Sequence, residues 1–192
     1  RAGDRPVLLV KRRPNAPYRR VLVPVDFSGL SGRVLEFARA LAPGAALSVL
    51  HVCDVELDYA LRRGGATDDQ ILTQRRQRFE SAAADLDSFV RAHTRVSGGG
   101  ARQGAVARLV AEGRPATVIP EVARRRRADL VVIGTHGRSG LRHVLLGRVA
   151  EHVLRSATCD VLALRPEGFR FESAWHPRAG DAGRRAPQGG PA

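Results

Sequence analysis

Three glycines with a defined spacing mark the stretch of this sequence best suited to bind a phosphate group. Gly134, Gly137 and Gly147 are separated by two and nine residues. Glycine allows a positive φ and a close approach of the backbone to a ligand, so amide N–H groups stay available as donors. A helix that begins at the third glycine would add donors and partial positive charge. We therefore expect an anion site here, with phosphate as the anion.

The elements on either side of this loop are expected to be a buried strand and an amphipathic helix. The strand, residues 129–134, contains the unbroken apolar run from Leu130 to Ile133, which is typical of a strand covered on both faces. The helix that follows has one apolar face, made of Val149, Ala150, Val153 and Leu154.

Strand and helix patterns alternate along the rest of the chain. Further strands are expected at residues 21–25, 47–52, 105–112 and 160–164, the third at a sheet edge because it contains Arg108. Further helices are expected at residues 30–41, 67–89 and 118–127, and residues 54–66 are expected to form a loop. This alternation predicts an α/β fold with a parallel sheet and helices on both of its faces.

Helix-capping and helix-face patterns add detail to two of these helices. Ser28 is expected to cap the first helix, and Thr67 with Gln70 three residues later has the pattern of a capping box. Arg75, Arg78 and Asp85 are expected on or near the outer side of the long helix, as a solvated, charged face. The apolar positions at helical spacing on the same helix are Ile71, Phe79, Ala82, Leu86 and Phe89.

The charge and the apolar content restrict the partners that we expect. The chain of 192 residues has a net charge of +13, nearly all from arginine. The arginines are scattered in pairs, and the run 124–127 is explained by the attraction between cations and a helix C-terminus, so we do not expect a nucleic acid partner. Nucleic-acid binding driven by the arginines stays open as one of three hypotheses for the function; the other two are given below. No apolar run approaches the roughly 20 residues needed to cross a bilayer, and no signal segment is evident, so we expect no membrane contact and a cytoplasmic location.

The residues that could bind a metal or perform catalysis do not form a recognisable set. The only cysteines, Cys53 and Cys159, are in no CxxC or Cys/His cluster and are expected to be free thiols. His51, His136 and His143 are expected to be packed or loop residues rather than ligands. No nucleophile with a base and an orienting partner is visible, so we do not expect an enzyme, and only a weak ATPase activity is left open.

Four stretches together resemble the universal stress protein family. The spacing of Gly134, Gly137 and Gly147 resembles that family's nucleotide loop, and the resemblance extends over about residues 20–165. It implies a Rossmann-like, open five-stranded parallel sheet in the order 3-2-1-4-5. One departure is Arg148, which stands where the family's ATP-binding pattern has Ser or Thr. The other three matching stretches are VLVPVDFS at 21–28, LSVLHVCD at 47–54 and CDVLALR at 159–165.

The resemblance implies a stress-response regulatory module that binds ATP, with or without magnesium, between the first and fourth strands. Pro24 and Ile133 would wall the nucleoside, and Asp26 and Val52 would line the adenine and the sugar. The phosphates would lie on Gly134, Gly137, Gly147, Arg148 and Val149. The missing hydroxyl at position 148 removes a hydrogen bond of about 1.5–3 kcal/mol to a charged acceptor.

Two interpretations of Arg148 follow. The guanidinium can replace the hydroxyl with a charge-assisted contact to phosphate. Alternatively it pairs with Glu151 on the helix surface, the loop binds no nucleotide, and the domain serves dimerisation or partner docking.

The segment RPVLLVK at residues 5–11 is similar to the chain's own last strand region. We interpret residues 6–10 as the final strand of a preceding domain of the same family, with a chance apolar segment as the alternative. Residues 1–19 would then be a residual strand and linker, 20–166 the nucleotide-binding domain and 167–192 a flexible tail. Such a strand needs a sheet edge, in this chain or in a partner, and predicts a homodimer or tandem-domain pairing through this region.

Overall fold

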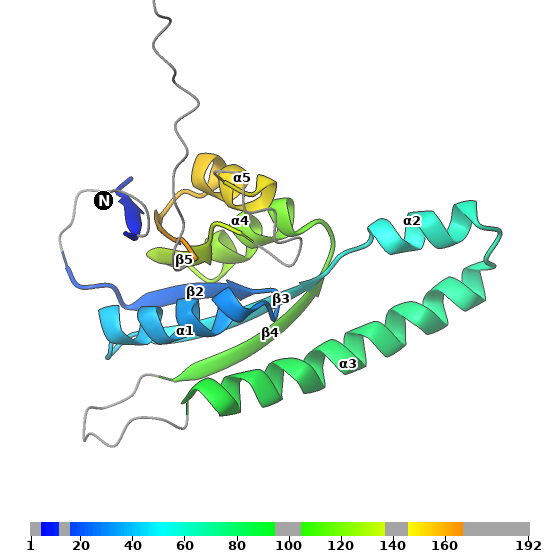
Figure 1. Ribbon diagram of the computed structural model, residues 1–192, viewed down its shortest axis with the longest axis horizontal. Coiled ribbons are helices and arrows are strands. Elements are labelled where there is room, and N and C mark those ends of the chain that lie inside the picture. Colours follow the sequence, from blue (N-terminus) through cyan, green and yellow to red (C-terminus); the bar gives the residue numbers. More distant parts are fainter. Residues whose placement is uncertain (1–4, 12–15, 95–104, 137–145, 167–192) are drawn as a thin grey trace, which may run out of the picture.

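The computed structural model describes residues 5–11, 16–94, 105–136 and 146–166. Within these ranges one sheet lies between helices on both of its faces (Figure 1). The strands are β1 (Val7–Leu9), β2 (Arg20–Val25), β3 (Ala46–Cys53), β4 (Val106–Glu112), β5 (Leu130–Gly134) and β6 (Asp160–Leu164). The helices are α1 (Gly29–Leu41), α2 (Glu56–Arg63), α3 (Asp68–Thr94), α4 (Pro115–Arg125) and α5 (Arg148–Ser156).

The sheet differs from the expected one in strand count and in strand order. Six strands follow the order β1-β6-β5-β2-β3-β4, and each neighbouring pair from β6 to β4 is parallel. The added strand, β1, is antiparallel to β6, with Val7 opposite Ala163 and Leu9 opposite Val161. The prediction of five parallel strands was wrong because the edge of β6 pairs with an apolar segment of the same chain. The sequence left open whether residues 6–10 pair with a sheet edge in this chain or in a partner, and Val7–Leu9 pair with the edge of β6 in this chain.

Each face of the sheet has its own buried core, because successive residues of a strand point to opposite faces. One core lies between the sheet and helices α1 and α3, and the other lies between the sheet and helices α4 and α5, so the expected cover on both faces is confirmed. The first core includes Val23, Val34, Leu35, Val49, Leu86 and Leu130. The second includes Leu22, Leu50, Ile119, Val131, Ile133 and Val153.

Three helix predictions need correction. Residues 56–63 form α2 inside the segment expected to be a loop, and α4 begins at Pro115 rather than near Val118. Proline suits the first helical position because its missing N–H has no partner there in any case. Phe79, expected in the core, is 39% exposed. The capping box is confirmed, since the amide of Thr67 donates to Gln70 Oε1 at 2.9 Å and the amide of Gln70 donates to Thr67 Oγ1 at 3.3 Å.

Helix α2 and the first part of α3 form a helical hairpin that extends beyond the sheet (Figure 1). Several large apolar side chains of this hairpin are exposed: Leu57, Tyr59, Leu72 and Phe79. In the described part of the chain, no helix combines the length and the apolar character that crossing a membrane requires. Gly137, His143, residues 97–100 and the tail 167–192, which carried expectations, lie outside the described residues.

Candidate functional site

The carboxyl ends of β2, β3 and β5 open into a cavity of about 730 Å³. The chain runs from β2 to β3 and β4 on one side, then returns to β5 on the other side of β2, so the cavity lies where the strand order switches. Ligands of open α/β sheets bind at such switch points. The cavity wall contains eight of the nine residues expected to contact nucleotide: Pro24, Asp26, Val52, Ile133, Gly134, Gly147, Arg148 and Val149.

The start of α5 supplies hydrogen-bond donors to this cavity. Gly147 is the N-cap residue, and no side chain among the described residues caps the helix there. The amide of Glu151 donates to the carbonyl of Gly147 at 2.9 Å and so makes the first helical hydrogen bond. The amides of Arg148, Val149 and Ala150 precede it and have no acceptor within the helix. This arrangement, with the positive end of the helix dipole, suits an anion.

Close packing explains the two described glycines of the loop. The Gly147 amide donates to the Thr135 carbonyl at 2.8 Å, and a Cβ on Gly147 would lie 3.0 Å from the same oxygen. A Cβ on Gly134 would lie 2.8 Å from Leu30 Cδ2. Neither glycine has a positive φ; among the described glycines, Gly65 and Gly113 do. These positions therefore need glycine for close approach of the backbone and not for a left-handed conformation.

Asp26, at the tip of β2, is fixed by two serines. Its Oδ1 accepts hydrogen bonds from the Ser28 amide at 3.0 Å, from Ser28 Oγ at 2.6 Å and from Ser31 Oγ at 2.7 Å. Ser28 is the N-cap residue of α1, as expected, but its hydroxyl donates to Asp26 and makes no cap hydrogen bond. Phe27, between Asp26 and Ser28, has a φ of 60°, which is uncommon for a residue other than glycine. The carboxylate is thus held in one orientation at the cavity.

The described histidines of the cavity are engaged in local contacts. His51 Nδ1 donates to the Val25 carbonyl at 2.9 Å, and its ring stacks on Phe27 with a centroid distance of 4.4 Å. His136 Nδ1 lies 2.9 Å from Thr135 Oγ1. No group of three metal-ligating side chains occurs within the described ranges. The interpretation of His51 as a packed residue is confirmed.

Arg148 is exposed at the first position of α5 and lines the cavity. The surface alternative predicted an ion pair between Arg148 and Glu151. Glu151 instead pairs with Arg155, one turn further along the helix, at 2.7 Å. Among the described contacts Glu151 is therefore engaged by Arg155, while Arg148 lines the cavity.

Sequence reasoning missed the contribution of α3 to the cavity. Gln77, Arg78, Ser81, Ala82 and Asp85 line it from this helix. Their spacing is helical, but a polar face of this kind is also typical of a solvated surface, so the sequence alone did not separate the two cases.

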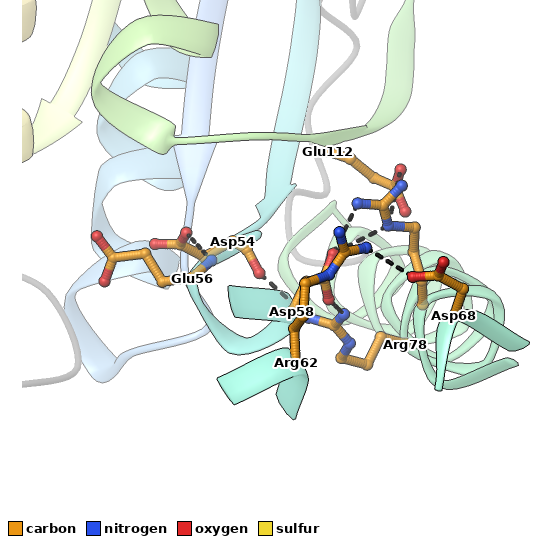
Figure 2. Close-up of polar contacts among 8 residues, drawn as sticks. Asp54, Glu56, Asp58, Arg62, Asp68, Arg78 and Glu112 are labelled. Atoms are coloured by element: carbon orange, nitrogen blue, oxygen red, sulfur yellow. Dashed lines mark hydrogen bonds and ion pairs between the residues drawn. The ribbon is translucent and has the colours of Figure 1, made fainter. Parts of the chain in front are cut away.

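Arg75 and Arg78 hold α2 against α3 through Asp58, so the prediction that they lie on a solvated face was wrong (Figure 2). Arg75 donates to Asp58 Oδ2 from Nε at 3.0 Å and from Nη2 at 2.7 Å, and Arg78 donates to Oδ1. Arg78 Nη1 also donates to the Asp54 carbonyl at 3.1 Å. Burial raises the pKa of Asp58, but the hydrogen bonds and charges of the two guanidinium groups outweigh it and lower the pKa overall.

The two cysteines are free thiols, as expected. Cys53 is the last residue of β3 and lines the cavity. Burial raises the pKa of its thiol, and the nearby negative charge of Glu112 raises it further. The thiol is therefore protonated at neutral pH.

A comparison with protein families matches residues 17–165 to the model of the universal stress protein family. Among curated proteins, the chain is 29% identical over 154 residues to universal stress protein MJ0531 of Methanocaldococcus jannaschii, covering 77% of this chain and 82% of that protein. It is 51% identical over 57 residues to a universal stress protein E homolog of Haemophilus influenzae. That match covers 30% of this chain and only 18% of the relative.

Solved structures show the same fold. The hypothetical protein MJ0577 superposes with a TM-score of 0.66 at 21% identity, covering 79% of this chain and 99% of that one. A universal stress protein in complex with cAMP gives a TM-score of 0.52 at 22% identity, covering 78% and 98%. Protein PA1789 of Pseudomonas aeruginosa gives 0.57 at 26% identity, covering 84% of this chain but 52% of that chain.

Proposed function

This chain belongs to the universal stress protein family, and from that premise we propose that it is a stress-response regulatory module that binds an adenine nucleotide, ATP. The binding site is the cavity at the carboxyl ends of β2, β3 and β5. The observation that carries the proposal is that eight residues from three strands and α5, separated by up to 125 positions in the sequence (Pro24 to Val149), line one cavity.

The parts of the cavity match the parts of the nucleotide. Pro24, Val52 and Ile133 supply apolar contact for the base and nucleoside, and the fixed carboxylate of Asp26 accepts hydrogen bonds from ribose hydroxyls. The amides at the start of α5, which have no acceptor within the helix, and the guanidinium of Arg148 bind the phosphates. Magnesium, where present, would be held by the phosphates, since the described residues offer no cluster of metal ligands.

Arginine at position 148 makes this site different from one with a hydroxyl. A guanidinium beside the positive end of a helix dipole is unfavourable, and a bound anion relieves that repulsion. We therefore propose that Arg148 makes phosphate binding both stronger and more dependent on salt. A complex of one structural neighbour with cAMP supports an adenine nucleotide as the ligand class.

Calorimetric titration tests the proposal. ATP, with and without magnesium, and cAMP are titrated into the wild type, an Arg148→Ala variant and an Arg155→Ala control, which removes an exposed arginine of α5 outside the cavity. We expect ATP binding by the wild type and the control, weakened about tenfold or more in Arg148→Ala, which corresponds to about 1.4 kcal/mol. Absence of binding by all three proteins at millimolar ligand would favour the other interpretation, a dimerisation or docking domain with an empty loop.

We further propose that the module binds and signals rather than catalyses, because the cavity carboxylate at the tip of β2, Asp26, is engaged by Ser28 and Ser31. A cytoplasmic setting agrees with the two free thiols. Product analysis after prolonged incubation with ATP checks the first point, and fractionation of the producing cells checks the second.

The pairing of β1 with β6 supports a tandem organisation. Val7, Leu8, Leu9 and Val10 are apolar on both strand faces yet 40–52% exposed. A strand that is apolar on both faces is typical of a sheet covered by helices on both sides. We propose that residues 6–10 are the last strand of a preceding domain and that residues 20–166 form the nucleotide-binding unit. Small-angle scattering of a longer chain that contains the upstream region tests this arrangement.

A further inference from the structure

The cavity extends past the expected nucleotide contacts to the other face of the sheet. Ile133 belongs to the core under α4 and α5, and Val52 packs against that core. Phe27 packs against the opposite core, under α1 and α3, and Val34 belongs to it. Both sets of residues line the same cavity. The cavity therefore bends around the carboxyl ends of the strands, with one part on each face.

We infer that the part on the α1 and α3 face, called here the α3 lobe, is a second ligand subsite that takes a nucleoside. The α3 lobe is lined by Phe27, Ser31, His51, Gln77, Ser81 and Asp85. The inference extends the proposed function, because the first nucleotide is placed on the α4 and α5 face.

The α3 lobe combines an aromatic wall with a polar one. The stacked rings of Phe27 and His51 form the wall next to the strands, with a centroid distance of 4.4 Å. Gln77, Ser81 and Asp85 follow one another at four-residue spacing and so lie along one side of α3, about 12 Å from first to last. A flat ring packs against aromatic side chains, and a polar row of that length suits the hydroxyl and amino groups of a base with its sugar.

The charges of the α3 lobe exclude a second phosphate. Asp85, on α3, contributes a carboxylate to the cavity wall on this side. Arg78 is engaged by Asp58 and by the carbonyl of Asp54. Carboxylates accept hydrogen bonds from amino and hydroxyl groups but repel phosphate, so an uncharged, donor-rich nucleoside fits.

Arg78 gives a second reason to expect a ligand here. Its Nε is the buried polar side-chain atom that has no hydrogen-bond partner among the described residues. A buried donor without an acceptor is unfavourable. A ring nitrogen or hydroxyl oxygen of a ligand in the α3 lobe would supply that acceptor.

The experiment distinguishes two origins of the nucleoside in the α3 lobe: the second half of a dinucleotide and a separate molecule. Adenosine, ATP and diadenosine tetraphosphate are the probes. Each is titrated into the wild type and into Ser81→Trp, which fills the α3 lobe from an exposed position of α3. Ala83→Trp is the matched control, since Ala83 is exposed on the same helix and does not line the cavity.

We expect two adenosine molecules per wild-type and Ala83→Trp chain and one per Ser81→Trp chain. If the nucleoside is half of a dinucleotide, diadenosine tetraphosphate should bind at least tenfold more tightly than ATP, and Ser81→Trp should abolish that gain. If the nucleoside is a separate molecule, diadenosine tetraphosphate and ATP should bind equally tightly, and adenosine should bind to ATP-saturated protein. Equal adenosine stoichiometry in wild type and Ser81→Trp, with no gain for the dinucleotide, would overturn the inference. If ATP does not bind but adenosine binds and Ser81→Trp removes that binding, the proposed function is overturned and the α3 lobe is still a nucleoside site.

Discussion

Asp160 accepts a hydrogen bond from the phenolic hydroxyl of Tyr18 at 2.8 Å through one carboxylate oxygen. Its other oxygen accepts a hydrogen bond from the backbone amide of Lys11, also at 2.8 Å. The buried first residue of β6 thus fixes the chain just after β1 and just before β2. Lys11 Nζ adds a hydrogen bond to the Ala157 carbonyl at 2.6 Å. The β1–β6 pairing therefore rests on side-chain contacts as well as on three backbone pairs.

The Tyr18–Asp160 contact predicts an unusually late tyrosine titration. Burial, the hydrogen bond and the charge of Asp160 raise the pKa of Tyr18 to about 12. In a Tyr59→Phe variant, Tyr18 is the remaining tyrosine, and we expect its phenolate absorbance to rise with a midpoint near pH 12. Because the folded pKa is above the ordinary tyrosine pKa of about 10, this contribution to stability is complete below pH 10 and is lost as the pH rises toward 12.

An Asp160→Asn substitution in the Tyr59→Phe background is the control for this titration. It removes the negative charge next to Tyr18, so the midpoint should move down toward 10. An unchanged late midpoint would mean that burial alone, and not Asp160, protects the hydroxyl.

The contacts of Asp58 with Arg75 and Arg78 are expected to stabilise the helical hairpin of α2 and α3. In Asp58→Asn, Arg75 and Arg78 lose their charged acceptor, and we expect the opening of α2 to become easier by about 1.5–3 kcal/mol, the contribution of hydrogen bonds to a charged group. Hydrogen exchange of the α2 amides measures this change. Asp68→Asn is the control, because it removes only the exposed Arg62–Asp68 pair, whose contribution is about 0–1 kcal/mol.

The same carboxylate gives a pH dependence. Its pKa is lowered in the folded protein, so its stabilising effect is present above the unfolded value of about 3.9 and is lost as the pH falls through the folded pKa. Exchange of the α2 amides should therefore accelerate in the wild type at acid pH, beyond the intrinsic pH effect, and much less in Asp58→Asn. Equal acceleration in both proteins would contradict this role.

Cys53 is predicted to react slowly with alkylating agents at neutral pH. Burial and then the charge of Glu112 raise the pKa of the thiol, so little of the reactive thiolate is present. Mass spectrometry after iodoacetamide treatment should show slower modification than for a free thiol in solution. Glu112→Gln should increase the rate and Glu121→Gln, on α4 and outside the cavity, should not. Alkylation at the rate of a free thiol would contradict the assignment.

The sequence predicted those features that depend on residues close together in the chain. The Thr67–Gln70 capping box spans three positions, and the β6 bounds of 160–164 follow from a single apolar run. The cavity residues were found because each lies at or beside the end of a strand or at the start of a helix, and parallel strand ends meet at one sheet edge.

The features that the sequence did not reveal depend on contacts across the fold. Arg75 and Arg78 look like surface residues until α2 brings Asp58 to them from 17 and 20 positions away. Ser81 lies on a polar helix face, and only the folded structure shows that it lines the cavity. The sequence predicted that residues 6–10 need a sheet edge but not which edge they use, so it did not reveal the contact of Lys11 with Asp160, 149 residues away.

Gly147→Ala tests whether the start of α5 binds phosphate. The added Cβ would lie 3.0 Å from the Thr135 carbonyl oxygen, a backbone atom that cannot rotate away, so the first turn of α5 must shift. We expect ATP affinity to fall about tenfold, or about 1.4 kcal/mol, because the amides of Arg148 and Val149 move from their positions. Gly44→Ala, where a Cβ meets no atom within 4 Å, should leave binding unchanged. Calorimetry on both variants, with circular dichroism to verify folding, makes the measurement. Full ATP affinity in a folded Gly147→Ala protein would show that these amides do not contact the phosphates.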